Sequence, residues 1–200
     1  MKLVIATRNP NKLEEIRAIF QINSLEIIDL RSYPELAPTE EDGATFEENA
    51  IKKAREAALA TGEWVLADDS GLAVEALHGE PGVFSARYAG EPSDYRANNA
   101  KLLDALAGQT TRAAVFHCVI ALSSPDGTAR TVQGICRGTI TNTPSGTRGF
   151  GYDPLFVPEG NTRTFAQLDA EHKNAISHRA VALRLAISEW ATLLDNTGSL

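Results

Sequence analysis

Two adjacent carboxylates, Asp68 and Asp69, carry the clearest chemical signal in this sequence. They belong to LADDSGL at residues 66–72, where an apolar strand is expected to end. In open α/β sheets, ligands bind at the carboxyl ends of the strands. If the strand continues, the two side chains point to opposite faces, so one could bind Mg²⁺ while the other activates water. A purely structural Asp-Asp-Ser-Gly turn is the alternative interpretation.

A second stretch, ATRNPNK at residues 6–12, lies between an expected strand and an expected helix. Such a junction offers backbone N–H groups and a positive helix end, both of which suit phosphate. Thr7 and Asn9 could add side-chain donors, and Lys12 a charge. The stretch lacks the GxxxxGK[ST] pattern, and an ordinary turn with a solvated lysine is the alternative.

A third stretch is the helix expected at about 45–61, which places Asn49 and Lys53 on one small-residue face. These two side chains could present a donor and a charge to a bound anion. The alternative is an amphipathic surface helix with solvated lysines. The acidic run at 40–42, which includes Glu41, could complement the helix dipole or hold a divalent cation.

The fourth stretch, GFGYDP at residues 149–154, combines glycines with aromatic rings. The glycines permit positive φ and a close backbone approach. Phe150 and Tyr152 suit stacking on a flat base, and Asp153 is held extended by the proline that follows it. A loop that only caps a core is the alternative.

The fifth stretch is KNAISHR at residues 173–179, which enters the last expected helix. Ser177 is a candidate N-cap, and His178 and Arg179 then fall in the first turn, where the helix dipole disfavours basic groups. This mismatch predicts that they meet an acceptor, and Lys173 adds another donor. Capping without function is the alternative. Together, the five stretches could supply a site that hydrolyses a nucleotide phosphate.

We expect an α/β fold with a central mixed sheet to position these stretches. The length of the chain predicts one domain. Short apolar runs and period-two stretches predict the strands, and 3.6-residue spacing with start and stop signals predicts the helices. The helix near 93 has Ser93 as its candidate N-cap. The expected strands are 2–6, 25–30, 64–67, 113–122, 128–140 and 155–157, and the expected helices are 13–21, 45–61, 93–106 and 177–194.

Composition excludes several classes of protein. With 200 residues, 19 Lys+Arg against 26 Asp+Glu and 43% hydrophobic residues, the chain is globular and acidic. It lacks the basic footprint of a non-specific nucleic-acid binder. No apolar stretch is long enough to span a membrane, and the apolar run at 3–6 is too short for a signal peptide. Cys118 and Cys136 are expected to be free thiols rather than a disulfide, so the expected location is cytoplasmic.

In this order, the motifs resemble the inosine triphosphate pyrophosphatase family, also called noncanonical purine NTP pyrophosphatases or RdgB-like proteins. The resemblance covers nearly the whole chain. One departure is Arg8, since the family usually has glycine at this position. The matching segments are ATRNPNK (6–12), EEDGATFEENAIKKA (40–54), ADDSGL (67–72), PGVFSARYAG (81–90), FHC (116–118), GFGYDP (149–154) and ISHR (176–179).

The resemblance implies that a purine nucleoside triphosphate such as ITP, dITP or XTP is hydrolysed to the monophosphate and pyrophosphate. It also implies an α/β fold with a long central mixed sheet flanked by helices. Residues 1–200 would form a single bilobed domain with a cleft between two lobes. The implied assembly is a homodimer, and the implied cofactor is Mg²⁺.

The resemblance also assigns roles to residues. Asp69 would be the proton acceptor for the attacking water, and Glu41, Asp69 and Asp68 would hold the metal. Donors from His178 or Arg179 would favour the C6 carbonyl of hypoxanthine and xanthine over the amino group of adenine. The implied substrate-binding residues are Thr7, Arg8, Asn9, Lys12 and Lys53 at the triphosphate, and Ser70, Phe150, Gly151, Tyr152, Asp153, Lys173, His178 and Arg179 around the base.

Three other interpretations remain open. A Maf-like pyrophosphatase would act on pyrimidine or methylated nucleotides, although GFGYDP and ISHR favour the purine branch. A regulatory nucleotide-binding module would need no water activation, which the Asp68–Asp69 pair and Glu41 argue against. An interaction protein would tolerate the combined loss of Lys12, Lys53 and Asp69, and no nucleotide would raise its melting temperature.

Overall fold

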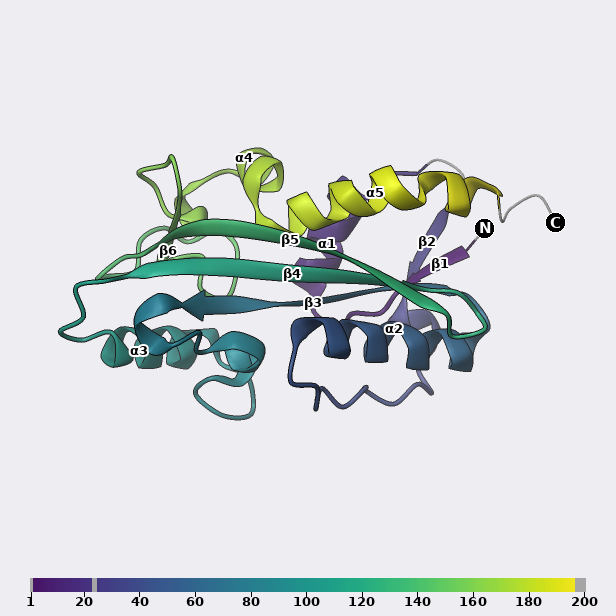
Figure 1. The fold of residues 1–200 in the computed structure, drawn as a ribbon, viewed down its shortest axis with the longest axis horizontal. Helices are drawn as coiled ribbons and strands as arrows, with labels where there is room; N and C mark the ends of the chain where they lie inside the picture. The colour runs from purple at the N-terminus through teal and green to yellow at the C-terminus, as the bar shows by residue number, and fades with distance from the viewer. Residues whose placement is uncertain (1, 23–24, 197–200) are drawn as a thin grey trace. The chain divides into compact units, whose positions relative to one another are not determined.

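The computed structural model describes residues 2–22 and 25–196 and has the expected α/β architecture (Figure 1). Four short 3-10 helices, at Leu30–Ser32, Glu75–Leu77, Gly82–Arg87 and Phe165–Gln167, lie between the longer elements. In chain order, the strands and α-helices are β1 (Lys2–Ile5), α1 (Pro10–Ile19), β2 (Glu26–Asp29), α2 (Phe46–Thr61), β3 (Trp64–Val74), α3 (Tyr95–Ala105), β4 (Ala113–Ser123), β5 (Ala129–Ile140), β6 (Phe156–Pro158), α4 (Ala170–Ile176) and α5 (His178–Asn196).

The six strands form one mixed sheet in the order β2-β1-β3-β4-β5-β6. β1 is parallel to both of its neighbours, with Val4 opposite Ile28 on β2 and Val65 on β3. β5 and β6 are antiparallel. The predicted mixed sheet with flanking helices is therefore confirmed. Within the part of the chain that the structure describes, no helix is both long enough and apolar enough to cross a lipid bilayer.

The chain divides into two compact units, each built from separated segments. The first unit contains the chain up to Asp69, then Cys118–Gly134, and then the chain from Arg179 onward. The second unit contains Ser70–His117 and Ile135–His178. Strands β3, β4 and β5 contribute residues to both units, so neither unit is a contiguous piece of sequence.

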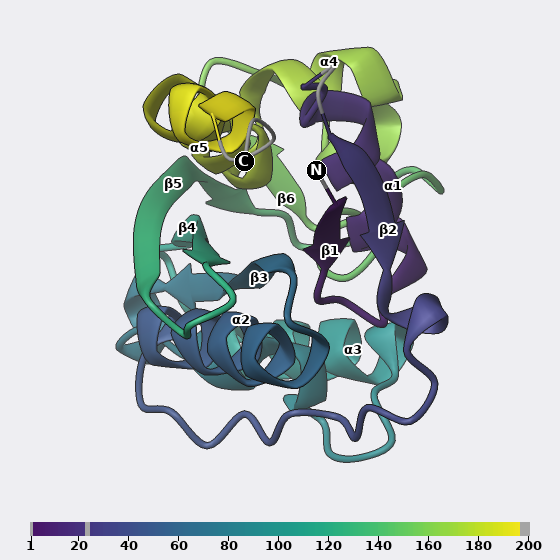
Figure 2. The ribbon, with the colours of Figure 1, turned by 90° about the vertical axis from the view of Figure 1, so that its right-hand side faces the viewer.

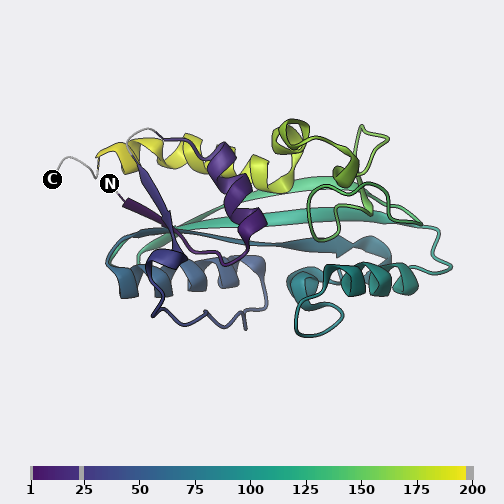
Figure 3. The same ribbon diagram turned by 180° about the vertical axis from the view of Figure 1, so that it is seen from behind.

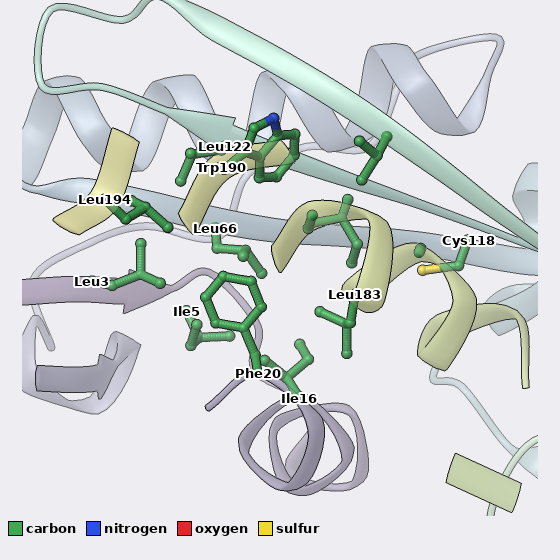
Figure 4. Close-up of a cluster of buried hydrophobic side chains, with 14 residues drawn as sticks. Leu3, Ile5, Ile16, Phe20, Leu66, Cys118, Leu122, Leu183, Trp190 and Leu194 are labelled. Atoms are coloured by element: carbon green, nitrogen blue, oxygen red, sulfur yellow. The ribbon is translucent and has the colours of Figure 1, made fainter. Parts of the chain in front are cut away.

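In the first unit, α1 and α5 cover one face of the strands and α2 covers the other (Figure 2). Side chains of β1 alternate accordingly, as the period of a strand requires. Leu3 and Ile5 pack with Phe20, the C-cap of α1, and with Trp190 of α5 (Figure 4). Val4, on the opposite face, packs with the alanines of α2. These small side chains allow α2 to approach the sheet closely.

The second unit has an aromatic core. Phe116 of β4, Phe156 of β6 and Phe165 pack together, with ring centroids 4.6 to 6.2 Å apart. Leu102 of α3 and Leu106, the C-cap of that helix, supply apolar side chains to the same cluster. Figure 3 shows α3 on one side of the strands of this unit and the α4 segment on the other.

Helix α2 begins and ends where its sequence signals predict. Thr45 is the N-cap, and its side chain forms a reciprocal capping box with Glu48. Gly62 follows the helix in the left-handed conformation at φ 69°, which glycine adopts without strain.

Two local expectations were wrong, and one short helix was not predicted. β3 does not end at residue 67 but continues to Val74, so Asp68 and Asp69 lie inside a strand. Asp94, not Ser93, caps α3, because its carboxylate accepts the N–H groups of residues 96 and 97. The Ser93 hydroxyl instead donates to the carbonyl of Ala86. The helix that was not predicted is α4, which contains Lys173; Ser177 is its C-cap and directly precedes α5.

Candidate active site

Asp68 lies at the centre of a buried charge cluster in the first unit. Its Oδ1 accepts from Lys12 Nζ at 2.6 Å, and its Oδ2 accepts from Arg179 Nε at 2.7 Å and from the Cys118 thiol at 3.1 Å. The side chain is completely buried. Burial by itself would raise the pKa of Asp68, but the charges of Arg179 and Lys12 hold this pKa well below its usual range. Asp68 is therefore held in its ionised form by these two cations.

Arg179, in the first turn of α5, is held between two carboxylates. Besides Asp68, it donates through Nη1 to Glu15 of α1. Its side chain is 2% exposed. The predicted acceptor for this unusually placed basic residue is thus found within the protein. Three guanidinium nitrogens already point at carboxylates, so the implied contact of Arg179 with a base receives no support here.

Asp69 lies on the other face of β3 and has a different environment. Its Oδ1 accepts from Lys53 Nζ at 2.7 Å, and the same nitrogen donates to the Asp68 carbonyl at 2.8 Å and to Glu41 Oε1 at 3.0 Å. Burial raises the pKa of Asp69, and Lys53 offsets this only in part. Burial would lower the pKa of Lys53, but the charges of Asp69 and Glu41 raise it, so the lysine stays protonated.

The acidic segment before α2 is held in place by the helix itself. The Asn49 amide oxygen accepts the N–H of Gly43 at 2.8 Å, and Lys52 binds Asp42 at 2.6 Å. Asn49 therefore organises the backbone that carries Glu41. A Cβ at position 43 would lie 2.7 Å from the Asn49 Oδ1 atom, so only glycine fits without a shift.

The turn at residues 7–9 is organised by its own side chains. The Asn9 carboxamide oxygen accepts the N–H groups of residues 11 and 12 and caps α1, while the Thr7 hydroxyl accepts the N–H of Asn9. Arg8 donates to the carbonyl of Leu36 at 2.5 Å. Among the described residues, His78 is the one non-glycine residue with positive φ. Arg8 thus occupies ordinary backbone, and its departure from glycine needs no strained conformation.

A divalent cation would find part of a binding site here. Across the described ranges 2–22 and 25–196, no three His, Cys, Asp or Glu side chains gather so as to hold a metal. Both Asp68 oxygens already accept from cations, which makes this carboxylate a poor ligand. Glu41 and Asp69, however, converge on one ammonium group. Two carboxylates completed by phosphate oxygens and water are a donor set that Mg²⁺ accepts.

The second unit brings together most of the residues expected around a base. Asp153 Oδ2 accepts from Lys173 Nζ at 2.5 Å and from the N–H of Phe150 at 2.8 Å. The same ammonium lies 4.9 Å from the Phe150 ring centroid. Gly149, at φ 71°, leaves room for Asp153, because a Cβ there would lie 2.0 Å from Oδ2. Asn99 of α3 donates to the Gly151 carbonyl at 3.1 Å.

Tyr152 and His178 are more buried than the sequence suggested. Tyr152 is 4% exposed and donates its hydroxyl to the Ser85 carbonyl at 2.9 Å, so it belongs to the core and offers no stacking face. His178 stacks on Phe116 with centroids 4.6 Å apart and planes 8° apart. Ser70, on β3, is half-buried. Phe150 therefore remains the candidate platform for a base.

Comparison with known proteins assigns the family. The sequence profile described as the Ham1 family matches residues 3–189. The chain belongs to the Ham1 family. The dITP/XTP pyrophosphatase of Desulforamulus reducens is 51% identical over 189 residues, covering 94% of each chain, and that of Geobacter sulfurreducens is 52% identical over 186 residues, covering 92% of this chain and 94% of the relative. The resemblance drawn from the motifs is thus confirmed.

Solved structures of Ham1 proteins have the same fold. The Staphylococcus aureus Ham1 protein superposes with a TM-score of 0.86 at 42% identity, covering 98% of this chain and 100% of that one. A nucleoside-triphosphatase described as a dITP/XTP pyrophosphatase from Mycobacterium abscessus superposes with a TM-score of 0.76 at 45% identity, covering 92% and 97%.

Three residues that contact the candidate site residues of this chain were not predicted from the sequence. Glu15 pairs with Arg179, Cys118 donates to Asp68, and Phe116 stacks on His178. One signal for Glu15 was available, because it lies three residues after Lys12 and so shares its helix face. No local pattern connects Cys118 to a carboxylate fifty positions earlier.

Proposed function

We propose that this chain hydrolyses deaminated purine nucleoside triphosphates, dITP, XTP and ITP, to the monophosphate and pyrophosphate. Relatives about 50% identical over more than nine-tenths of the chain bear the name dITP/XTP pyrophosphatase. One observation carries the proposal. Asp68 and Asp69 are neighbours whose pKa values are displaced in opposite directions by their surroundings. Such divergence between adjacent titratable groups is typical of acid–base assignment in an active site.

Asp69 is the proposed general base. Its raised pKa makes it a better proton acceptor than an ordinary aspartate, and Lys53 keeps it ionised near neutral pH. It takes a proton from water as the water oxygen bonds to the α-phosphorus. The bond from that phosphorus to the bridging oxygen breaks, and pyrophosphate leaves. Glu41 and Asp69 are the proposed ligands of Mg²⁺, which when bound neutralises charge on the phosphate oxygens.

Cationic and polar groups of the first unit are the proposed triphosphate ligands. Lys12 and Lys53 supply charge, and the turn at residues 7–9 precedes α1, whose N-terminal end favours anions. Because Lys12 is bound to Asp68, an arriving phosphate would share this ammonium with a carboxylate. The lysine is thereby held in one orientation before substrate arrives.

The second unit supplies the proposed base-binding residues. Phe150 would stack on the purine, and Asp153, Lys173 and His178 would meet its edge. A buried donor such as the His178 imidazole is satisfied by a C6 carbonyl but left unpaired by the amino group of adenine. An unmade buried hydrogen bond costs about 1–3 kcal/mol, or about 5- to 150-fold in selectivity.

The decisive experiment measures pyrophosphate and phosphate release from XTP, dITP, ITP, GTP and ATP, with and without Mg²⁺. Wild type is compared with Asp69→Asn and, as a matched control, with Asp104→Asn on the exposed face of α3. The expected result is Mg²⁺-dependent pyrophosphate release from deaminated purines, lost in Asp69→Asn alone. Release of single phosphates, or full activity in Asp69→Asn, would contradict the mechanism. Nucleotide binding without turnover would favour a regulatory module.

We also propose that the chain forms a homodimer through the second unit. One face of β5 presents Ile135, 39% exposed, and Arg137 to solvent. A groove of about 510 Å³ beside them is bordered by Glu75 and Glu159. Both signs of charge border one groove, so a two-fold axis could pair Arg137 of each copy with an acidic residue of the other.

Light scattering tests this assembly. Arg137→Glu should yield a monomer, and the double variant Arg137→Glu, Glu159→Arg should restore the dimer if these two groups pair. A monomeric wild type would contradict the proposal. A cytoplasmic location is proposed on the two cysteines, Cys118 and Cys136, which are both free thiols and suit a reducing compartment.

A further inference from the structure

The segment between the first 3-10 helix and α2 carries Glu41 but has no regular structure. It runs from Tyr33 to Thr45. Near its end it is tied to α2, because Asn49 binds the backbone of Gly43 and Lys52 binds Asp42. Nearer its start, the Arg8 guanidinium donates to the carbonyl of Leu36. Glu41 thus lies on a stretch of chain that is tied on both sides.

The turn that carries Arg8 is anchored to β3 by backbone hydrogen bonding. Residue 6, at the start of the turn, donates its N–H to the Leu66 carbonyl of β3 at 2.8 Å, two residues before Asp68. Thr7 and Asn9 use their side-chain oxygens to accept backbone N–H groups within the turn. Arg8, between them, reaches out of the turn to a residue 28 positions later. A charged donor on a carbonyl makes a stronger hydrogen bond than a neutral donor does.

We propose that Arg8 is a positioning residue that holds the 33–45 segment so that Glu41 stays beside Lys53 and Asp69. This inference rests on the proposed function, in which Glu41 helps to bind the metal. It gives Arg8 a role different from the implied one of binding phosphate directly. The guanidinium acts on the reaction through the backbone of Leu36 and then through Glu41.

The size of the effect follows from the length of untied chain. With Arg8 in place, about seven residues separate the ties at Leu36 and Gly43. Without it, about eleven residues separate the end of the 3-10 helix from Gly43. This lengthening alone reduces the fraction of closed segment about twofold, and the lost hydrogen bond increases the effect to about 2- to 10-fold.

Amide hydrogen exchange tests the positioning without any assay of turnover. Peptides covering residues 33–45 should exchange about 2- to 10-fold faster in Arg8→Ala than in wild type, with the interior of α2 unchanged. Arg8→Lys should restore part of the protection, because an ammonium can also donate to a carbonyl. Arg130→Ala, which removes an exposed arginine of β5 in the same unit, is the matched control and should change nothing in this segment. Unchanged exchange in Arg8→Ala would overturn the proposal.

A double-mutant cycle with Glu41→Gln tests the consequence for the reaction. Arg8→Ala should lower kcat and raise the Mg²⁺ concentration for half-maximal activity about 2- to 10-fold, with little change in KM for the nucleotide. In the Glu41→Gln background, Arg8→Ala should have no further effect. A raised KM with fully multiplicative effects would identify Arg8 as a phosphate ligand and overturn the proposal. If wild type turns over no nucleotide, the proposed function fails while the exchange result still decides the role of Arg8.

Discussion

Replacing Arg179 by methionine tests whether Asp68 depends on a buried cation. The Asp68 side chain is completely buried, and the guanidinium binds both of its oxygens. Breaking a buried ion pair from one side costs about 3–5 kcal/mol, because it leaves an uncompensated charge. Lys12 would remain at 2.6 Å, so the lower end applies, and we expect Arg179→Met to lose about 3 kcal/mol. In a chain of this size, that loss lowers Tm by about 6–12 °C.

The pH dependence of this stability loss shows whether the ionised Asp68 carboxylate causes it. In wild type, the pKa of Asp68 is lowered in the folded state, so its stabilisation is present above the ordinary aspartate pKa and is lost as pH falls through the depressed value. In Arg179→Met, the folded-state pKa of Asp68 rises. The loss of unfolding free energy in Arg179→Met, relative to wild type, should therefore be largest near neutral pH and should shrink as Asp68 becomes protonated in acid.

Urea unfolding of wild type and Arg179→Met over a series of pH values measures this deficit. Arg130→Met, at an exposed arginine, should change stability by less than about 0.5 kcal/mol. Adding Asp68→Asn to Arg179→Met should cost less than the sum of the single changes, since the pair is then removed as a unit. A loss below about 1 kcal/mol, or one that stays constant into acid, would refute the reasoning.

Three further outcomes are expected. Because the pKa of Asp69 is raised above 3.8, the ordinary value for aspartate, kcat/KM should fall in acid with a midpoint above pH 3.8. A pH–rate profile whose acid midpoint lies below pH 3.8 would exclude Asp69 as the base. The Arg31 guanidinium lowers the pKa of Asp29 to about 2, so the ionised Asp29 should add about 1–2 kcal/mol to the free energy of unfolding above pH 3.8, and this stabilisation should be lost as pH falls through about 2. Urea unfolding of wild type and Asp29→Asn at both ends of that pH range measures it. An equal loss of stability in Asp29→Asn at both pH values would contradict the assignment. Gly149→Ala should lower the free energy of unfolding by about 2 kcal/mol and raise KM, because position 149 has a positive φ and an added Cβ would clash with Asp153. An unchanged KM would show that this loop does not take part in binding the base.

Local signals were enough to predict both ends of α2, although not the cap of α3. The boundaries of α2 follow from Thr45, Glu48 and Gly62, which act within the helix and its flanks. β4 and β5 were likewise predicted from the sequence, and the structure shows buried and exposed side chains alternating through the middle of β5, whereas β4 is continuously buried from Cys118 onward. For α2, whose determinants lie close in sequence, the sequence was therefore sufficient.

The end of β3 could not be predicted in the same way. Asp-Asp-Ser-Gly has the composition of a turn, because two carboxylates inside a sheet are costly without cations. The cations exist, but they come from distant positions, with Lys12 and Arg179 on one carboxylate and Lys53 on the other. The motif indicated the chemistry, and only the fold revealed which carboxylate is structural.

The discontinuous first unit has a consequence for how the protein is made. Its core joins Leu3, near the start of the chain, to Leu183 and Trp190 on α5. A ribosome must therefore synthesise the chain as far as α5 before β1 can meet these packing partners. Until then Asp68 also lacks Arg179, and the face of β1 that carries Leu3 and Ile5 lacks its cover from α5. We expect this unit to close only after α5 has been synthesised, and nascent chains that end before α5 to be the stage most in need of protection from aggregation.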